Sequence, residues 1–325
     1  MRVLIIGAAG MVGRKLAERL AADPRIGEAA VAGMHLADVV EPSAPAGTAE
    51  VSTSIADLAI AGVAERLITE RPDVIFHLAA IVSGEAERDF EKGYRINLDG
   101  TRALLGAIQA AHVAEGYRPR LVFTSSIAVF GRPFPDVIPD TFHATPLTSY
   151  GAQKAACELL IADMTRRRLL DGVSLRLPTI CVRPGRPNAA ASSFFSGIIR
   201  EPINGEEAIL PVAESVRHWF ASPRSAVSFL LRAASLPMEA IGAHPSLTLP
   251  GLSATVGEQI ASLKRMVSDH AVRLIRREPD PEIERIVSGW PQAFEATRAS
   301  ELGFEAETSF DEIVRIYLED ERGGA

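Results

Sequence analysis

Cysteine is scarce in this sequence, with only Cys157 and Cys181 among 325 residues. Neither belongs to the short paired spacings of disulfide frameworks and structural zinc sites, so we expect no disulfide and no metal site. Cys157 is expected in a helix and Cys181 beside a strand, where a free thiol packs as a small apolar side chain. The scarcity of cysteine argues against a disulfide-stapled or zinc-binding class of protein.

Long apolar runs and basic clusters are also missing. No stretch reaches 18 uninterrupted apolar residues, so no membrane span is predicted. Residues 1–10 are apolar but lack a basic leader and a small-residue cleavage site, so we interpret them as a first strand and expect a cytoplasmic protein. The net charge is −7, and the densest basic cluster, Arg166 to Arg168, is interpreted as a solvated helix end. Binding to nucleic acid or to a membrane is therefore not expected.

The first half of the chain instead alternates apolar strands with helical stretches. Strands are predicted at 3–6, 30–36, 74–78, 121–125 and 173–177. Helices are predicted at 11–20, 61–70, 97–113 and 151–168. Strands that alternate with helices pair in parallel, and their nearly continuous apolar character fits a sheet covered on both faces. The sequence predicts an α/β fold, a Rossmann-type doubly wound parallel sheet.

The pattern changes after about residue 178, where prolines break the chain into short pieces. Helices are predicted at 191–200, 223–235, 255–267 and 309–320, and strands near 246–249 and 271–275. We interpret residues 1–177 as an NAD-binding Rossmann domain. We interpret residues 178–325 as a smaller substrate-binding lobe with some elements that return to the main sheet.

A glycine loop connects the first strand to the first helix. Gly7 permits a tight turn, Gly10 lets the backbone approach a pyrophosphate, and Gly13 lets the helix pack closely on the sheet. The N–H groups at the start of that helix are free to bind the phosphates. Asp38 ends the second strand, where its carboxylate is expected to bind ribose hydroxyls and to repel the 2′-phosphate of NADP. Asp57 is placed either near the adenine or as a helix N-cap.

A second pattern supplies reactive groups. Tyr150 and Lys154 are one helical turn apart, roughly 6 Å along the axis, so they share a face of the helix. The ammonium group is expected to stabilise the phenolate of Tyr150 and lower its pKa. Such a phenol can exchange the proton of an alcohol while hydride leaves the same carbon, and Ser126 can hydrogen-bond the alcohol oxygen. These residues predict an oxidoreductase.

Taken together, these motifs resemble the extended short-chain dehydrogenase/reductase family, the NAD-dependent epimerases and dehydratases. The resemblance rests on GAAGMVG at 7–13, HLAA at 77–80, TSSIAVFG at 124–131 and YGAQK at 150–154. It implies that Ser126, Tyr150 and Lys154 are catalytic. The cofactor-binding residues that it implies come from the glycine loop, the strand ends and the catalytic helix: Gly7, Gly10, Met11, Val12, Gly13, Asp38, Asp57, Leu58, Leu78, Ala79, Ala80, Asn97, Tyr150, Lys154, Leu177, Thr179 and Ile180.

The stretches at 145–160, 174–202 and 217–227 resemble members of the family that oxidise a small sugar acid. The substrate that this resemblance implies is D-erythronate, oxidised next to its carboxylate to a 2-keto acid. A small acid needs a cation for its carboxylate and polar groups for its hydroxyls. The candidate substrate-binding residues are Ser83, Ser126, Tyr150, Arg183, Asn188, Ser192, Arg217 and His218. The alternatives are that Arg183 and Arg217 pair with surface carboxylates and that Ser192 caps a helix.

Two other functions remain open. The first is a nucleotide-sugar epimerase, which uses the same three residues and a retained NAD. The second is an NAD-sensing regulator, against which the complete set of Ser126, Tyr150 and Lys154 argues. A sugar-nucleotide dehydratase is disfavoured because no Asp-Glu pair follows Ser126. The sequence leaves the oligomeric state open, a homodimer included.

Overall fold

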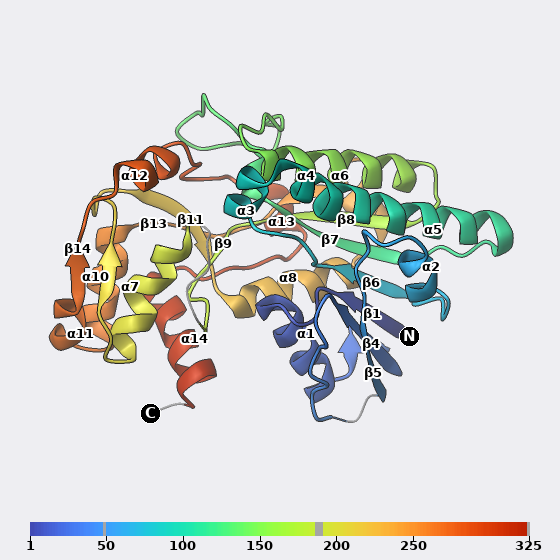
Figure 1. The fold of residues 1–325 in the computed structure, drawn as a ribbon, viewed down its shortest axis with the longest axis horizontal. Helices are drawn as coiled ribbons and strands as arrows, with labels where there is room; N and C mark the ends of the chain where they lie inside the picture. The colour runs from blue at the N-terminus through green and yellow to red at the C-terminus, as the bar shows by residue number, and fades with distance from the viewer. Residues whose placement is uncertain (48–49, 186–190, 324–325) are drawn as a thin grey trace.

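The right half of the molecule in Figure 1 is built around a seven-stranded sheet, in which every strand is parallel to its neighbours. The computed structural model describes residues 1–47, 50–185 and 191–323. The strand order is β12-β8-β7-β6-β1-β4-β5. The strands are β1 (Arg2–Ile6), β4 (Gly33–Asp38), β5 (Glu50–Ile55), β6 (Val74–His77), β7 (Arg120–Ser126), β8 (Asp171–Leu177) and β12 (Ser246–Thr248). The α/β fold class is confirmed.

Helices cover both faces of this sheet because successive strand residues point to opposite sides. Val3 and Ile5 of β1 pack with α1 (Met11–Ala22) and α8 (Pro223–Ser235) in one apolar cluster. Leu4 and Ile6 face the opposite cluster, which includes side chains of α2 (Val63–Leu67), α5 (Gly100–Glu115) and α6 (Ser149–Arg166). The strand order reverses at β1, which lies between β4 and β6. In open α/β sheets, ligands bind beyond the carboxyl ends of strands at such a point.

The predicted elements of the first half are present, with shifted boundaries. The strand predicted at 30–36 begins at Gly33, and the residues before it form the short pair β2 (Arg25–Ile26) and β3 (Ala29–Ala30). The stretch predicted as one helix over 97–113 is a π-helical segment, Tyr94–Asp99, followed by α5. Three short helices were not predicted: α3 (Ser83–Arg88), α4 (Phe90–Gly93) and a 3₁₀ turn at Ile127–Val129.

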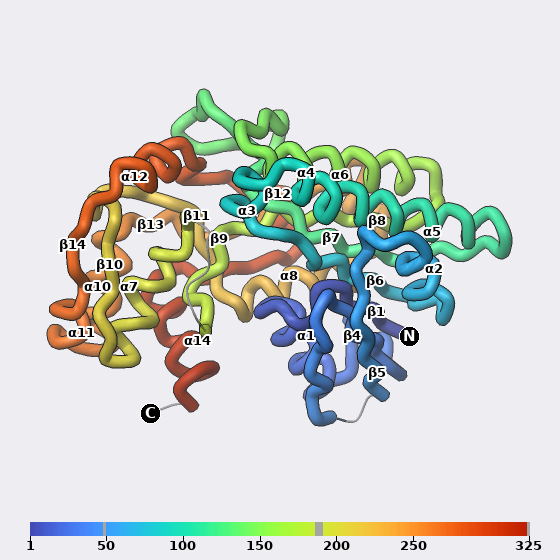
Figure 2. Tube along the Cα trace, in the orientation of Figure 1, coloured from blue at the N-terminus to red at the C-terminus, as the bar shows by residue number. Residues whose placement is uncertain are grey.

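The second half forms a separate apolar core beside the sheet, on the left of Figure 2. Its strands are β9 (Thr179–Ile180), β11 (Arg217–Ala221) and β13 (Leu252–Thr255) in one sheet, and β10 (Ala208–Leu210) and β14 (Ile275–Arg277) in another. The helices after residue 191, besides α8, are α7 (Ser193–Ile203), α9 (Met238–Ile241), α10 (Val256–Met266), α11 (Asp269–Arg273), α12 (Pro281–Val287), α13 (Thr297–Glu301) and α14 (Phe310–Arg322). Some elements of the second half belong to the main sheet layer: β12 extends the sheet, and α8, α9 and α13 contribute side chains to the apolar cluster on one of its faces.

The strand predicted at 271–275 is wrong. Residues Asp269–Arg273 form the helix α11, and the strand β14 begins only at Ile275. The hydroxyl of Ser268 accepts a hydrogen bond from the N–H of Ala271 at 3.1 Å, which caps this helix. Serine followed by an acidic residue is a helix-start signal, and here it prevails over the apolar pair Ala271-Val272.

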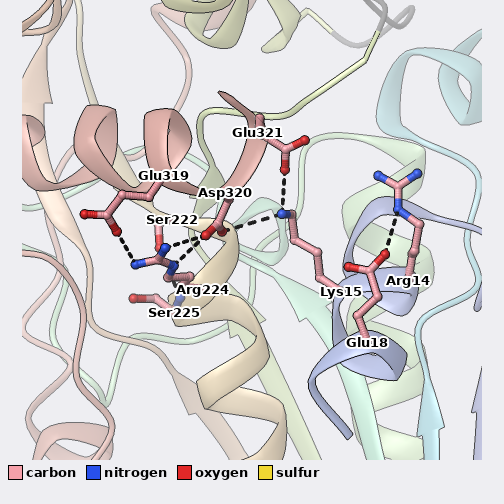
Figure 3. Close-up of polar contacts among 9 residues, drawn as sticks. All are labelled: Arg14, Lys15, Glu18, Ser222, Arg224, Ser225, Glu319, Asp320 and Glu321. Atoms are coloured by element: carbon pink, nitrogen blue, oxygen red, sulfur yellow. Dashed lines mark hydrogen bonds and ion pairs between the residues drawn. The ribbon is translucent and has the colours of Figure 1, made fainter. Parts of the chain in front are cut away.

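The C-terminal helix α14 ties the second half to the sheet layer (Figure 3). Lys15 of α1 lies 2.6 Å from Glu321 and 3.6 Å from Asp320. Arg224 at the start of α8 pairs with Glu319 and Asp320. Because α1 begins at the glycine loop, these ion pairs connect α14 to the helix that carries that loop. In the part of the chain that the structure describes, no helix is both long and apolar enough to cross a membrane.

Candidate active site

Two adjoining cavities lie at the carboxyl edge of the sheet. The glycine-loop cavity, of about 350 Å³, is lined by Gly7, Ala9, Gly10, Asp38, Val39, Val40, Ala56, Asp57, Leu58, Ile81 and their neighbours. The tyrosine cavity, of about 340 Å³, is lined by Ser126, Tyr150, Lys154 and Arg183, among others. Leu78 and Ala80 line both. The two cavities therefore form one elongated site across the point where the strand order reverses.

The glycine loop lies where the two cavities meet. A β-carbon on Gly7, whose φ is +93°, would come within 2.6 Å of the backbone nitrogen of Ala79. A β-carbon on Gly13 would come within 2.2 Å of the carbonyl oxygen of Gly7. Neither position tolerates a side chain. Gly10, the N-cap of α1, supplies no side-chain cap, so the N–H groups of the first turn remain free to bind an anion.

Asp38 lies at the end of β4 and lines the glycine-loop cavity. Its Oδ2 accepts a hydrogen bond from the N–H of Ala9 at 2.9 Å, and its Oδ1 accepts one from the N–H of Val39 at 2.7 Å. A carboxylate accepts about four hydrogen bonds, so lone pairs remain for a ligand. Asp38 is thus held against the loop in the place where the sequence predicts a ribose.

Two further residues assigned to the cofactor, Asp57 and Asn97, differ in whether they line a cavity. Asp57 lines the glycine-loop cavity and also accepts a hydrogen bond from the N–H of Ala59 at 2.9 Å, so it stabilises a local turn. Asn97 is buried and does not line either cavity. Its Oδ1 accepts from the N–H of Ile81 at 2.9 Å, and its Nδ2 donates to Gln153 at 2.7 Å. Asn97 therefore holds the backbone of Ile81, which lines the cavity.

The structure brings Ser126, Tyr150 and Lys154 together. Ser126 ends β7, and Tyr150 lies in the first turn of α6, whose N-cap Thr148 accepts a hydrogen bond from the N–H of Gly151 at 3.1 Å. Lys154 is buried one turn later, and its Nζ donates to the carbonyl oxygen of Thr124 at 2.8 Å. This nitrogen lies 5.7 Å from the centroid of the Tyr150 ring. All three side chains line the tyrosine cavity.

Burial dominates the proton affinities of these groups. Burial raises the pKa of Tyr150 to about 12, against which the charge of Arg183 and a hydrogen bond with Ser126 act. Burial lowers the pKa of Lys154 to about 8. The pKa of Tyr150 thus lies above its ordinary value, contrary to the expectation from its spacing to Lys154, and Arg183 is a cation whose charge acts against this rise. Sequence spacing missed this effect because Arg183 lies on a different segment of the chain.

Arg183 is positioned as a carboxylate-binding group. Its Nε donates to the carbonyl oxygen of Ile180 at 3.0 Å, and its Nη2 donates to the hydroxyl of Ser192 at 2.8 Å. Within residues 1–47, 50–185 and 191–323, no carboxylate forms an ion pair with it. A guanidinium has five N–H donors, so the remaining donors are available to a ligand. Ser192, the N-cap of α7, thus helps to orient Arg183 and lines the same cavity.

His218 and Thr179 are joined by a hydrogen bond of 2.7 Å between Nε2 and Oγ1. The other ring nitrogen, Nδ1, lies 3.1 Å from the carbonyl oxygen of Pro291. Since that oxygen only accepts, Nδ1 carries the proton and the hydroxyl of Thr179 donates to Nε2. Burial lowers the pKa of His218 to about 4, so the ring is neutral at pH 7. His218 therefore lines the tyrosine cavity without offering a cation to a carboxylate.

The other predicted substrate residues fall in different places. Ser83, at the start of α3, lines the tyrosine cavity, as do Leu177, Thr179 and Ile180. Arg217 does not: its Nη1 donates to the carbonyl oxygen of Ser253 at 3.0 Å, and its Nη2 lies 3.5 Å from Glu258. The strand β11 alternates, so Arg217 and His218 point to opposite faces. Asn188 lies outside the described residues.

Sequence reasoning missed one wall of the tyrosine cavity. Gly289, Trp290 and Pro291 line it, although they follow α12 and are more than 100 residues from Tyr150 in the sequence. No motif marks them, and a tryptophan near the end of a chain gives no signal about which loop it contacts. Phe130, Gly131 and Leu147 also line this cavity.

Comparisons with known proteins show which proteins this chain is similar to. The model of the "NAD dependent epimerase/dehydratase family" matches residues 3–233. The chain is 44% identical to a D-erythronate dehydrogenase from Cupriavidus necator, over 98% of both chains. It is 39% identical to a D-erythronate dehydrogenase from Haemophilus influenzae, over 98% of this chain and 99% of the other.

Among solved structures, the chain is similar to one described as a nucleoside-diphosphate-sugar epimerase from Agrobacterium tumefaciens. The identity is 60% and the TM-score 0.96, over 100% of this chain and 95% of the other. An L-threonine dehydrogenase from Cupriavidus necator shares the fold at 22% identity and a TM-score of 0.84, over 98% of this chain and 99% of the other.

Proposed function

The chain belongs to the NAD-dependent epimerase/dehydratase family, and we propose that within this family it oxidises D-erythronate to its 2-keto acid. Two D-erythronate dehydrogenases that match it over nearly their whole length support this substrate. The observation that carries the proposal is Arg183, a cation without a carboxylate partner in the described structure, next to Tyr150 in the tyrosine cavity. A free sugar acid supplies both the carboxylate and the alcohol that such a pair would bind.

The residues at the elongated site fit NAD. The glycine loop and the free N–H groups of α1 suit its pyrophosphate, and Asp38 suits the adenosine ribose. We assign residues 1–177 to cofactor binding and residues 178–325 mainly to substrate binding. NAD, when bound, accepts the hydride that leaves the alcohol carbon of the substrate.

In this proposal, the phenolate of Tyr150 accepts the proton of the C2 hydroxyl. Ser126 donates a hydrogen bond to the same oxygen and keeps it next to Tyr150. Arg183 binds the carboxylate through charge-assisted hydrogen bonds and lowers the pKa of Tyr150, so one cation serves both binding and proton transfer. Lys154, held by the carbonyl of Thr124, is assigned to binding the cofactor and to supplying positive charge behind the tyrosine.

An epimerase acting on a nucleotide sugar is the second candidate, because the similar structure from Agrobacterium tumefaciens carries that description. The size of the tyrosine cavity favours the small acid. Its volume of about 340 Å³ is near the lower end of ligand sites, and the nicotinamide must take part of that space.

The retention of NAD separates the two candidates. An epimerase must reduce its own oxidised intermediate again, so it keeps the cofactor, whereas a dehydrogenase releases NADH in every turnover. We expect protein purified through extensive dialysis to contain much less than one NAD per chain and to regain full activity with added NAD. Stoichiometric NAD that survives dialysis would favour the epimerase.

Asp38 is expected to select NAD over NADP. Replacement with Asn keeps the size of the side chain but removes the charge that repels a 2′-phosphate. The ratio of kcat/KM for NAD to that for NADP should fall at least tenfold in Asp38→Asn, as measured with saturating D-erythronate. A preference of the wild-type protein for NADP would contradict this placement of Asp38.

A further inference from the structure

The segment 289–295 follows α12, lines the tyrosine cavity with its first three residues, and is bonded to distant parts of the chain from Pro291 onward. The N–H groups of Gly289 and Trp290 donate to the carbonyls of Ile286 and Val287 at 3.1 and 3.0 Å. The carbonyl of Pro291 accepts from His218 at 3.1 Å, and that of Gln292 accepts from the hydroxyl of Ser253 at 2.9 Å. We call residues 289–295 the strap.

The far end of the strap is hydrogen-bonded to Ile138. The carbonyl of Ala293 accepts from the N–H of Ile138 at 3.0 Å, and the N–H of Glu295 donates to the carbonyl of Ile138 at 3.0 Å. Phe294 is buried, with its ring 5.5 Å from that of Phe130, which lines the cavity. Anchors at both ends and along its length make the strap a fixed wall, so substrates must fit the space that it leaves.

Trp290 is the large side chain that this wall presents to the cavity. Its ring lies 5.2 Å from that of His218 and 6.4 Å from that of Phe195, so it is packed against the second-half core. It is half-buried, and its indole N–H forms no hydrogen bond within the described residues. Trp290 is thus an aromatic side chain that lines the cavity while its ring packs against the second-half core.

We propose that the strap is the size-selecting wall of the substrate site, that Trp290 sets the longest acid accepted, and that His218 is a positioning residue that holds the wall in place. The neutral ring of His218 connects Thr179 on one side to Pro291 on the other. This inference rests on the proposed function and adds to it a residue that determines which sugar acid is accepted.

The test compares two acids that differ by one carbon. D-Ribonate repeats the stereochemistry of D-erythronate at C2 and C3 and adds one hydroxymethylene group. One carbon in a closed pocket is worth 10- to 200-fold in kcat/KM. We expect the unchanged enzyme to prefer D-erythronate by at least about tenfold and Trp290→Ala to lower that preference at least about tenfold.

Tyr117→Phe is the control because Tyr117 lies outside the cavity and the strap, with its hydroxyl donating to the carbonyl of Pro72. It should leave the preference unchanged, while Trp290→Phe should lower it partly. Binding of NADH, followed by fluorescence, reports whether each variant is folded. A Trp290→Ala variant that binds NADH and keeps the preference of the unchanged enzyme would overturn the role of the wall.

His218→Leu removes the donor that holds Pro291. Like Trp290→Ala, this change should lower the preference for D-erythronate. In the double variant, the loss of preference should be smaller than the two single losses combined, because both changes act on one wall. Equal losses for both acids would instead mean that His218 supports the fold alone. An unchanged enzyme that oxidises neither acid would overturn the proposed function and this inference with it, whereas oxidation of D-erythronate with an unaltered preference in Trp290→Ala overturns the inference alone.

Discussion

Replacement of Tyr150 with Phe is expected to lower kcat at least a hundredfold. The change removes the hydroxyl that exchanges the substrate proton but keeps the ring that packs beside Lys154. General acid–base groups contribute roughly 10²- to 10⁴-fold to rates, and no other hydroxyl in the described site combines contact with Ser126 and a nearby cation. The measurement is initial-rate kinetics of NADH formation at saturating D-erythronate.

The binding of NADH is the control for this variant. Its dissociation constant should change little, because the glycine loop and Asp38 are untouched. Ser126→Ala is a companion variant that should lose less activity, since the alcohol oxygen keeps its contact with Tyr150. Turnover of Tyr150→Phe close to that of the unchanged enzyme would show that another group exchanges the proton.

Replacement of Arg183 with Ala is expected to raise KM for D-erythronate roughly 10²-fold. A small acid offers few atoms, so charge-assisted hydrogen bonds must supply most of its affinity, and loss of such a contact costs about 2–3 kcal/mol. Arg217→Ala is the matched control because Arg217 pairs with Glu258 outside the cavity. An equal rise of KM in both variants, or in neither, would contradict the assignment of the carboxylate to Arg183.

Arg183 also predicts a change in the pH dependence of the rate. Its positive charge favours the phenolate of Tyr150 and so lowers the pKa of that group. Removal of the charge raises this pKa, so the rising limb of kcat against pH should move to higher pH in Arg183→Ala. Arg183→Lys, which restores the charge, should bring the limb back toward that of the unchanged enzyme. If this limb does not move, the charge of Arg183 has no effect on the proton transfer by Tyr150.

Much of the first half of the molecule was predictable because its signals are local. Apolar runs that end in glycine, aspartate or serine mark strands β1, β4 and β7, and each of these ends lines the site. A four-residue spacing on a helix fixes which side chains share a face, as it does for Tyr150 and Lys154. Asn97 shows the limit: a residue that the family resemblance assigned to the cofactor contacts Ile81 and Gln153 instead of a cavity.

The substrate end was less predictable because tertiary contacts build it. The sequence gives no reason to choose between Arg183 and Arg217 as the carboxylate-binding residue. The structure excludes Arg217 because the alternation of β11 turns it away from His218 and places it beside Glu258. In the sequence, His218 is a candidate cation for the substrate carboxylate. In the structure, it is buried between Thr179 and Pro291, and burial keeps its ring neutral. Trp290 reaches the site through hydrogen bonds to His218 and Ile138 made by its neighbours, which no local pattern encodes.

The central claim, oxidation of a free four-carbon sugar acid with NAD, is tested most directly by identification of the product. Purified protein is incubated with D-erythronate and NAD, NADH is followed by its absorbance, and the carbon product is analysed by mass spectrometry. The account predicts one 2-keto acid formed for each NADH. No NADH from D-erythronate, together with interconversion of UDP-glucose and UDP-galactose by the same preparation, would contradict it.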